Sequence, residues 1–308
     1  MNRWKIVRAF TLGPLLEATV PKPGNVNRHR DFEDLTLYNF LFADTAVVGV
    51  YYEAVKTAEL LRKGVLSFNE AGLGELIKRA VAASREAQDA NPNFGVVALS
   101  VPLVMGLALG RNMLDAREKA RLLIEESTVR DSMELYRAIR LASPKGIPGG
   151  VKYDVYSEES FKELFRDGIN LARLAEMSCE RELIFCEWLN GYELSYSTFG
   201  RLYELIKELP LEEAVVRAFI ELLSENLDTL IVRKAGVEEA RLVREKARGV
   251  LSGELGIEEF DSFMYEKGDL RNPGSLADIM AVALSLLVLR GLRMEVRNGR
   301  AWGVIGRP

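Results

Sequence analysis

The polar residues best suited to chemistry begin just after an N-terminal helical stretch. Segment 21–25 reads Pro-Lys-Pro-Gly-Asn; its two prolines hold the backbone extended, and its Lys22 can meet a phosphate. Asp31 and Asp34 follow three residues apart, a spacing that places two carboxylates on one face of a helix and can hold Mg²⁺. The alternative is that both aspartates charge the first turn of the next helix, where the macrodipole favours acidic side chains.

Three later segments have a similar mixture of Pro, Gly and Asn. Segment 91–95, Asn-Pro-Asn-Phe-Gly, precedes an apolar helix whose first amides can receive an anion. Segment 143–150 is a loop that either closes over a ligand or connects two helices, and Asp154 follows it. Segment 272–274, Asn-Pro-Gly, places Asp278 in the first turn of the last apolar helix, where a carboxylate needs a polar partner. For each segment the alternative is ordinary turn chemistry.

A charged group lies upstream of the last segment. Asp228, Arg233 and Lys234 precede Gly236, so a carboxylate and two cations gather at a helix break. They either help to bind an anionic ligand or form an exposed charged turn, which contributes little to stability. The chain has neither the Gly-x-x-x-x-Gly-Lys-Ser/Thr of a P-loop nor a Gly-x-Gly-x-x-Gly that leads from strand to helix, so any nucleotide must be bound by other means.

The elements that must position these segments are helices. Apolar residues recur at three- and four-residue spacing with good helix formers between them, and no comparable set of alternating strand segments intervenes. The periodic stretches are 51–63, 73–86, 116–126, 159–189, 198–207, 211–223, 237–250 and 275–289. This pattern predicts an all-α fold.

The sequence shows no domain boundary. It contains no low-complexity stretch, no repeat of fixed period and no break long enough to be a linker. We therefore expect one globular multi-helix bundle over 1–308, with a helical core over about 1–292. Asn298-Gly299 lies between short segments that contain apolar residues, which is the favoured signal of a type I′ hairpin, and it predicts a short β-ribbon over 293–308.

Composition excludes several classes of protein. Of the 308 residues, 48% are hydrophobic and 28% are charged, which is the balance of a folded globular chain. The cations are scattered and the net charge is −4, so general nucleic-acid binding has no support. The most apolar stretch, 95–110, contains Pro102 and is shorter than a membrane span, and the N-terminus lacks the apolar core of a signal peptide. We expect a cytoplasmic protein that does not enter a membrane.

The two cysteines, Cys179 and Cys186, lie seven residues apart within the predicted helix 159–189. A rise of about 1.5 Å per residue separates them by roughly 10 Å, which is farther than a disulfide can bridge. No Cys or His pair has the spacing of a zinc site. We therefore expect two buried thiols that act only in packing.

Taken in order, the four segments resemble the motif set of the triphosphoribosyl-dephospho-CoA synthase family, from about Glu17 to about Gly291. The blocks that carry the resemblance are Pro-Lys-Pro-Gly at 21–24 with Arg28 and His29-x-Asp31, Asn91 with Gly95, Pro148-Gly149-Gly150 with Asp154, and Asn272-Pro273-Gly274 with Ala277-Asp278. Each block alone is a weak signal, whereas four blocks in the same order are specific.

The resemblance implies an enzyme that moves triphosphoribosyl from ATP to the 2′-hydroxyl of 3′-dephospho-CoA and releases adenine, with Mg²⁺, on the route to a prosthetic group. Carboxylates would stabilise the positive charge on the ribose and take the acceptor proton, while cations and Mg²⁺ hold the triphosphate. The expected catalytic carboxylates are Asp31, Asp34, Asp154 and Asp278, with the metal on Asp31 and Asp34. The residues expected to bind substrate are Lys22, Gly24, Asn25, Arg28, His29, Asn91, Asn93, Gly95, Gly149, Arg233, Lys234, Asn272 and Gly274.

The chain also departs from the bacterial pattern of this family. The Gly-Ala that precedes the histidine is missing before His29, and the Asn-Thr-His-Lys-Gly of bacterial members stands here as 91–95 without its His and Lys. These differences resemble a divergent archaeal branch and leave the acceptor open. We expect His29, which lies between two arginines, to hydrogen-bond phosphate or carboxylate and not to be the obligatory general base.

Two alternatives to the transferase follow from the same residues. A Mg²⁺-dependent helical hydrolase of a nucleotide or ADP-ribose-like bond would use them with water as the nucleophile. A non-catalytic nucleotide-binding helical protein would keep the fold and the binding loops alone. The sequence leaves the oligomeric state open, with a homodimer among the alternatives.

Overall fold

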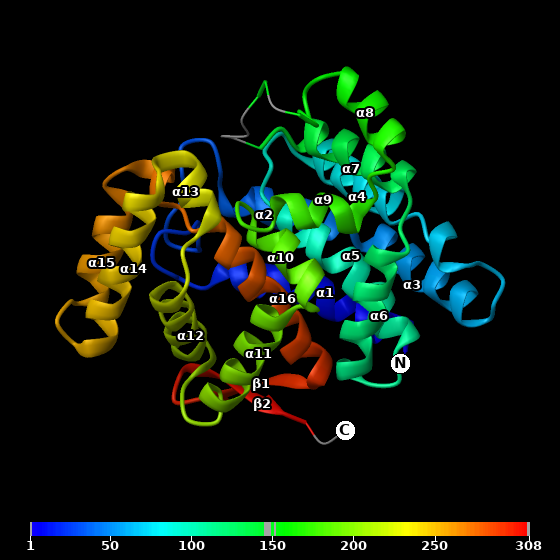
Figure 1. Ribbon diagram of the computed structural model, residues 1–308. Helices are drawn as coiled ribbons and strands as arrows, with labels where there is room; N and C mark the ends of the chain where they lie inside the picture. Colours follow the sequence, from blue (N-terminus) through cyan, green and yellow to red (C-terminus); the bar gives the residue numbers. More distant parts are fainter. Residues whose placement is uncertain (1, 145–148, 151, 307–308) are drawn as a thin grey trace. The chain divides into compact units, whose positions relative to one another are not determined.

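The computed structural model describes residues 2–144, 149–150 and 152–306. Pro148 of the third motif block therefore lies outside the described residues. Helices dominate and the one sheet in the described part of the chain has two strands, so the prediction of an all-α fold with a C-terminal hairpin is confirmed (Figure 1). None of the helices in these ranges is long and apolar enough to span a membrane.

Contacts divide the chain into two compact units. Unit 1 comprises Met1–Thr11 and Leu41–Glu193, and unit 2 comprises Leu12–Phe40 and Leu194–Pro308. The helices α1 (Arg3–Thr19) and α2 (Leu37–Ala46) each contribute residues to both units. The single domain expected over 1–308 stays a prediction.

Unit 1 is built around a buried helix. Its further elements are α3 (Val48–Arg62), a 3₁₀ turn (Phe68–Glu70), α4 (Leu73–Ala87), α5 (Phe94–Leu109), α6 (Met113–Glu125), α7 (Val129–Ala142), α8 (Glu159–Asp167), α9 (Leu171–Ser178) and α10 (Leu183–Asn190). Helix α5 is apolar all round and packs against α3, α4, α6 and α10. A helix of this composition is stable only as the centre of a core.

Side chains from outside α5 supply hydrogen bonds to carbonyl groups near its proline, Pro102. Pro102 has no N–H to donate to the carbonyl of Ala98, four residues before it. The indole N–H of Trp188 donates to that carbonyl at 3.1 Å, and the hydroxyl of Tyr192 donates to the next carbonyl, Leu99, at 2.9 Å. Both donors are fully buried, and both carbonyls therefore have a hydrogen-bond partner despite the proline.

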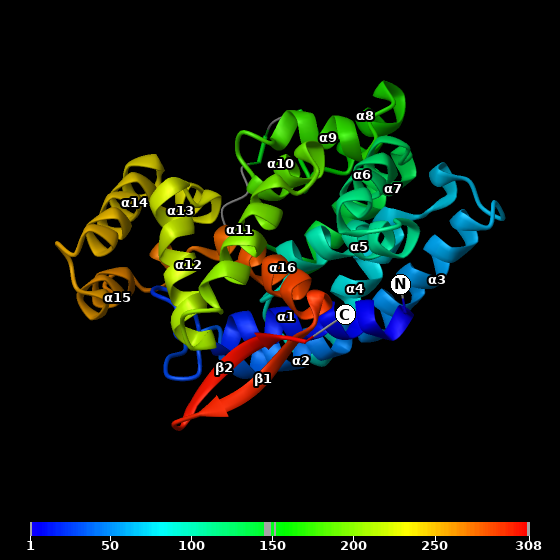
Figure 2. The ribbon, with the colours of Figure 1, turned by 90° about the horizontal axis from the view of Figure 1, so that it is seen from below.

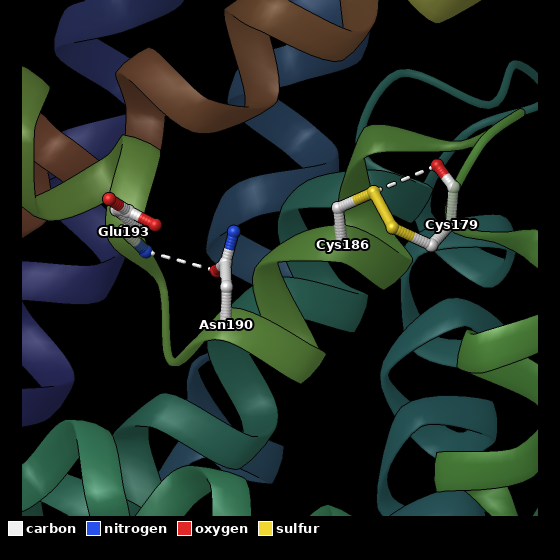
Figure 3. Close-up of a disulfide and its surroundings, with 4 residues drawn as sticks. All are labelled: Cys179, Cys186, Asn190 and Glu193. Carbon is white, nitrogen blue, oxygen red and sulfur yellow. Dashed lines mark hydrogen bonds between the residues drawn. A yellow bond between two sulfur atoms is a disulfide. The ribbon is translucent and has the colours of Figure 1, made fainter.

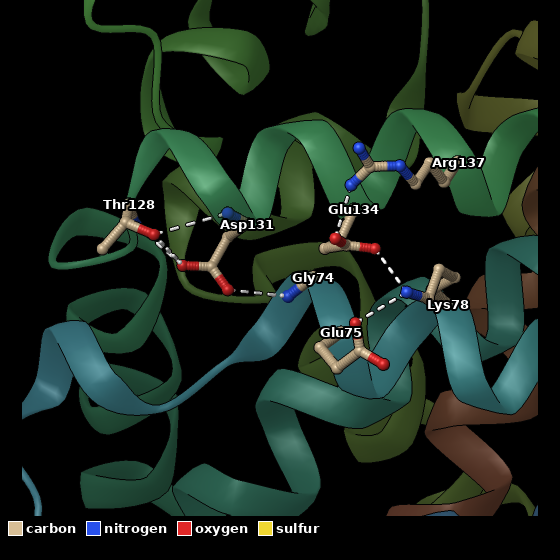
Figure 4. Close-up of polar contacts among 7 residues, drawn as sticks. All are labelled: Gly74, Glu75, Lys78, Thr128, Asp131, Glu134 and Arg137. Carbon is tan, nitrogen blue, oxygen red and sulfur yellow. Dashed lines mark hydrogen bonds and ion pairs between the residues drawn. The ribbon is translucent and has the colours of Figure 1, made fainter. Parts of the chain in front are cut away.

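Helices α4 and α7 lie side by side and exchange polar contacts at their first turns (Figure 4). Thr128 and Asp131 form a capping box at the start of α7, and the second oxygen of Asp131 accepts the Gly74 N–H at 3.0 Å. One turn further on, the Glu134 carboxylate accepts from Lys78 of α4. The close approach depends on the missing side chain of Gly74.

The expectation of two free thiols is wrong, because Cys179 and Cys186 form a disulfide with their Cα atoms 4.6 Å apart (Figure 3). The predicted helix over 159–189 is in fact three helices, α8, α9 and α10. Cys179 follows the last residue of α9, and the chain turns before α10 begins at Leu183. This turn returns Cys186 to its partner, whereas a continuous helix would have held the two cysteines apart.

Unit 2 contains the remaining elements, except that Glu193, the first residue of α11, belongs to unit 1. They are α11 (Glu193–Leu205), α12 (Leu211–Glu225), α13 (Thr229–Ala235), α14 (Val237–Ser252), α15 (Ile257–Tyr265), a 3₁₀ turn (Gly268–Arg271), α16 (Gly274–Arg290), β1 (Leu292–Arg297) and β2 (Arg300–Ile305). Helix α16 is buried from 275 to 277 and from 279 to 289 and contacts α12, α13 and β1. It forms the core of this unit.

The C-terminal ribbon confirms the hairpin that the sequence predicts (Figure 2). Strands β1 and β2 pair antiparallel, with Leu292 opposite Ile305 and Arg297 opposite Arg300. The turn residues Asn298 and Gly299 have φ values of 52° and 74°, which is the left-handed backbone that a type I′ turn requires.

Candidate functional site

The first motif block forms a loop that α15 contacts at two adjacent residues, and Figure 1 shows this loop in blue near α15. The Gly24 N–H donates to Asp261 Oδ1 at 3.2 Å, and the Tyr265 hydroxyl donates to the Asn25 carbonyl. Gly24 has a φ of 78°, and a Cβ there would stand 2.7 Å from Met264 Cε. The loop therefore needs glycine at this position for its backbone and for its packing.

A hydrogen bond joins the first and fourth motif blocks. Asn25 Nδ2 donates to Asn272 Oδ1 at 2.9 Å, and a Cβ on Gly24 would also lie 3.3 Å from Pro273 Cδ. The two asparagines are 247 positions apart in the chain. Two blocks that the sequence singles out separately are thus in direct contact within unit 2.

Lys22 lies inside unit 2 and its side chain is fully buried. Its Nζ is 2.8 Å from Glu17 Oε1, donates to the Glu17 carbonyl, and lies 5.5 Å from the centre of the Phe219 ring. Burial raises the pKa of the Glu17 carboxyl, and the charge of Lys22 opposes that rise. This placement favours a role in holding the loop, and contact of Lys22 with substrate stays a prediction.

Arg28 and His29 lie on the exposed side of the same loop. Arg28 pairs with Glu212 at 2.7 Å, and its Nε donates to His29 Nε2 at 3.0 Å. The imidazole therefore accepts a hydrogen bond from a cation in this arrangement. The expectation that His29 is not the obligatory base stays a prediction, and an accepting Nε2 is consistent with it.

Asp31 and Asp34 are exposed and lie in the non-helical segment before α2. Asp31 Oδ1 accepts the N–H of Leu37, the first residue of that helix, at 2.7 Å. The two aspartates are therefore not on one helix face, because the helix begins after both of them. Their hard oxygen donors in one exposed loop still suit Mg²⁺, and in the described ranges no group of three or more His, Cys, Asp or Glu residues is arranged to hold a metal.

Asp228 caps two helices at once. Its Oδ1 accepts the Ile231 N–H of α13 at 2.9 Å, and its Oδ2 accepts the Leu276 N–H of α16 at 2.8 Å. The neighbouring Ser275 hydroxyl accepts from the Leu230 N–H at 3.1 Å. Asp228 thus fixes the start of α16, where Gly274 packs against Leu230, and the half-buried Asp278 is the fifth residue of that helix.

We expect the Asp228 carboxyl to make unit 2 less stable as pH rises. Burial raises its pKa to about 6 from the ordinary 3.8, although the backbone N–H groups oppose this. Between these values the unfolded chain loses the proton first, so about 3 kcal/mol of stability is present below pH 4 and lost as pH rises through 6. Urea denaturation at pH 4 to 7 should show this slope in the parent and a flatter one in Asp228→Asn. Equal slopes would contradict the assignment.

The two cations in the last turn of α13, Arg233 and Lys234, have different surroundings. Lys234 Nζ lies 3.1 Å from Asp269 Oδ2 and donates to the Asp269 carbonyl, so it ties α13 to the 3₁₀ turn. Arg233 is half-buried, and its charge lowers the pKa of Asp228 against the larger effect of burial. Their roles in substrate binding stay predictions.

In unit 1, the second motif block is anchored to a buried carboxylate. Asn93 precedes α5, and its Nδ2 donates to Asp44 Oδ1 at 2.8 Å, while Ser84 donates to Asn93 Oδ1 at 3.1 Å. Asp44 and Asn93 are 2% and 3% exposed. Asn91 is half-buried and Gly95 is buried in the first turn of α5. Asp44, Asp261 and Tyr265 were missed by the sequence analysis, because nothing in their local sequence marks them.

The third block places Asp154 in a loop that the carboxylate itself organises. Its Oδ2 accepts the Gly150 N–H at 2.7 Å, its Oδ1 accepts the Tyr156 N–H at 2.9 Å, and a Cβ on Gly149 would stand 3.4 Å from Oδ2. These backbone hydrogen bonds lower the pKa of Asp154. Both oxygens already serve the loop, which favours a structural role, and catalysis by Asp154 stays a prediction.

The predicted site residues therefore fall into two sets. Unit 1 carries Asn91, Asn93, Gly95, Gly149 and Asp154. Unit 2 carries Lys22, Gly24, Asn25, Arg28, His29, Asp31, Asp34, Arg233, Lys234, Asn272, Gly274 and Asp278. Within unit 2, the first motif block contacts the fourth motif block directly.

Comparison with known proteins identifies the family that the motif blocks resemble. A family model described as ATP:dephospho-CoA triphosphoribosyl transferase matches residues 3–296. The crystal structure of an Archaeoglobus fulgidus protein assigned as a triphosphoribosyl-dephospho-CoA synthase is 26% identical, with a TM-score of 0.58, over 79% of this chain and 97% of that one. No curated protein matches the chain. Because the family model spans nearly all of its length, the chain belongs to the ATP:dephospho-CoA triphosphoribosyl transferase family.

Proposed function

We propose that this chain transfers triphosphoribosyl from ATP to the 2′-hydroxyl of 3′-dephospho-CoA and releases adenine. The family match supports the reaction, and the structural observation that carries it is the hydrogen bond between Asn25 and Asn272, because it brings two motif blocks 247 residues apart into contact. In the reaction the bond from C1′ to the adenine nitrogen breaks and a bond from C1′ to the acceptor oxygen forms. The acceptor hydroxyl gives its proton to a general base, and adenine, which keeps the electron pair of the broken bond, takes up one proton and departs as neutral adenine.

The carboxylates of unit 2 are the groups suited to this chemistry. Asp278, half-buried in α16 after Asn272-Pro273-Gly274, is the proposed base or the stabiliser of positive charge on the ribose. Exposed Asp31 and Asp34 would hold Mg²⁺, which when bound neutralises charge on the triphosphate. The remaining ligands would be triphosphate oxygens and water, since Mg²⁺ prefers six oxygen ligands.

The second motif block, segment 91–95, concerns the identity of the acceptor substrate. Segment 91–95 has no His or Lys, and its Asn93 amide is turned to Asp44. The segment therefore brings no cation that could pair with a phosphate of the acceptor. A nucleotide acceptor other than dephospho-CoA is the alternative that this difference supports.

The test is incubation of the purified protein with ATP, Mg²⁺ and dephospho-CoA, followed by mass spectrometry. We expect free adenine and the coupled product in equal amounts. Adenine with ribose triphosphate and no coupled product would instead identify the hydrolase, and no adenine with any nucleotide acceptor would identify a non-catalytic binding protein. Replacing dephospho-CoA with CoA, whose 3′-phosphate adds charge beside the acceptor hydroxyl, measures acceptor selectivity.

The proposed reaction also sets the expected surroundings of the protein. ATP and a CoA precursor are cytoplasmic compounds, so we propose that the chain works in the cytoplasm. A homodimer stays a prediction, which light scattering on the purified protein can test.

A further inference from the structure

Arg30 differs from the other cations of the motif blocks in how it is held. Lys22 is buried against Glu17, Arg28 is bonded to Glu212 and His29, and Lys234 is bonded to Asp269. Arg30 is 45% exposed, and its ion pair with Asp261 Oδ2 spans 3.6 Å, which is longer than a hydrogen bond. Its guanidinium therefore keeps N–H donors for a ligand.

The Arg30 guanidinium is nevertheless oriented by its surroundings. Its central carbon lies 4.1 Å from the centre of the Tyr265 ring, close enough for a cation–π contact. Tyr265 is itself held, because its hydroxyl donates to the Asn25 carbonyl and its ring lies 5.4 Å from that of Phe32. A guanidinium held against a ring loses less freedom when it binds a planar or tetrahedral anion.

The position of Arg30 in the chain matches the charge of the substrate. It directly precedes Asp31, and both residues are exposed in the same loop. A donor of positive charge thus lies next to a proposed magnesium ligand. A metal-bound triphosphate, which carries both bound cation and exposed anionic oxygens, suits such a pair.

We infer that Arg30 binds the triphosphate of ATP, and that Tyr265 and Asp261 on α15 are positioning residues that orient its guanidinium. The inference rests on the proposed function for the identity of its ligand. It adds a residue that the motif blocks do not single out, and it assigns to α15 a role beyond holding the loop.

The test is calorimetry with inorganic tripolyphosphate and Mg²⁺, which needs no catalysis. Arg30→Ala should weaken binding by at least about tenfold, as loss of a charge-assisted hydrogen bond does. Arg30→Lys keeps the charge but not the fork or the stacking, so it should recover only part of the affinity. The matched control is Arg297→Ala, because Arg297 is also an exposed arginine over a ring, that of Trp302, and is paired with Glu295. It should bind as the parent does.

A pair of Tyr265 variants isolates the positioning role. Tyr265→Phe keeps the ring, whereas Tyr265→Leu removes it; both lose the hydroxyl that donates to Asn25. We expect the Leu variant alone to weaken tripolyphosphate binding several-fold, and to raise the KM for ATP at a kcat close to that of the Phe variant. Equal affinities for Leu and Phe would overturn the role of the ring.

The remaining outcomes separate this inference from the proposed reaction. Parental affinity in Arg30→Ala, equal losses in Arg30→Ala and Arg297→Ala, or no binding of tripolyphosphate by the parent would each overturn the phosphate contact. A parent protein that binds tripolyphosphate through Arg30 but never releases adenine would leave the contact intact and refute the transferase. Thermal melting of each variant confirms that a loss of binding is not a loss of fold.

Discussion

Replacing Asp31 with Asn should slow adenine release by roughly 100-fold or more and leave the fold intact. Asp31 Oδ1 accepts the Leu37 N–H, and the amide oxygen of Asn can accept the same hydrogen bond. The substitution therefore keeps the start of α2 and removes the charge that a magnesium ion needs. Asp34→Asn should have a similar effect, because Asp34 shares the exposed loop.

Glu33→Gln is the matched control, since Glu33 is an exposed carboxylate between the two aspartates. It should release adenine at the parental rate. The measurements are adenine release at saturating ATP and Mg²⁺, calorimetry with Mg·ATP, and thermal melting. If both aspartate variants bind Mg·ATP as tightly as the parent, the aspartates serve only the start of α2, and the metal role moves to Asp154 or Asp278.

Gly74→Ala should destabilise unit 1 by about 2–3 kcal/mol, even though alanine is the better helix former. A Cβ at this position would stand 2.1 Å from the Asp131 carbonyl oxygen and 2.6 Å from its Cα, so it meets backbone that cannot rotate away. Asp131 is also held by the capping box of α7, which restricts how far that turn can move (Figure 4). The gain in helix propensity, at most about 1 kcal/mol, offsets only part of this cost.

Gly200→Ala provides the opposite result as a control. Gly200 lies inside α11 and a Cβ there meets nothing within 4 Å, so alanine should stabilise the protein by about 0.5–1 kcal/mol. Urea denaturation of both variants beside the parent gives the two differences. A Gly74→Ala midpoint equal to that of the parent would show that α4 and α7 do not approach as closely as described.

Local sequence patterns were enough to predict the interiors of several helices and the hairpin, and to reveal the order of the motif blocks. Apolar residues at helical spacing predicted the interiors of α3, α4, α12 and α14, and Asn298-Gly299 predicted the ribbon, because both signals depend on residues close together in the chain. The block order was enough to indicate the family, which the family model confirms.

Contacts between distant residues set where several helices end and which polar side chains meet. Residues 179–182 contain no Gly or Pro, so the pattern ran on through the turn that brings Cys179 to Cys186. The Trp188 indole donates to the Ala98 carbonyl, which Pro102 leaves without its helical partner, and so joins α10 to α5. The spacing of apolar residues cannot predict such a contact.

The same reason explains the site residues that the sequence analysis missed. Asp44, Asp261 and Tyr265 bond to motif residues 49, 237 and 240 positions away, and a carboxylate or phenol has no local signature of such a partner. The chemical types along a sequence therefore name the candidate groups, but only the folded chain decides which of them are buried, which are capped and which, like Arg30, keep free donors. Those differences depend on contacts between residues far apart in the chain.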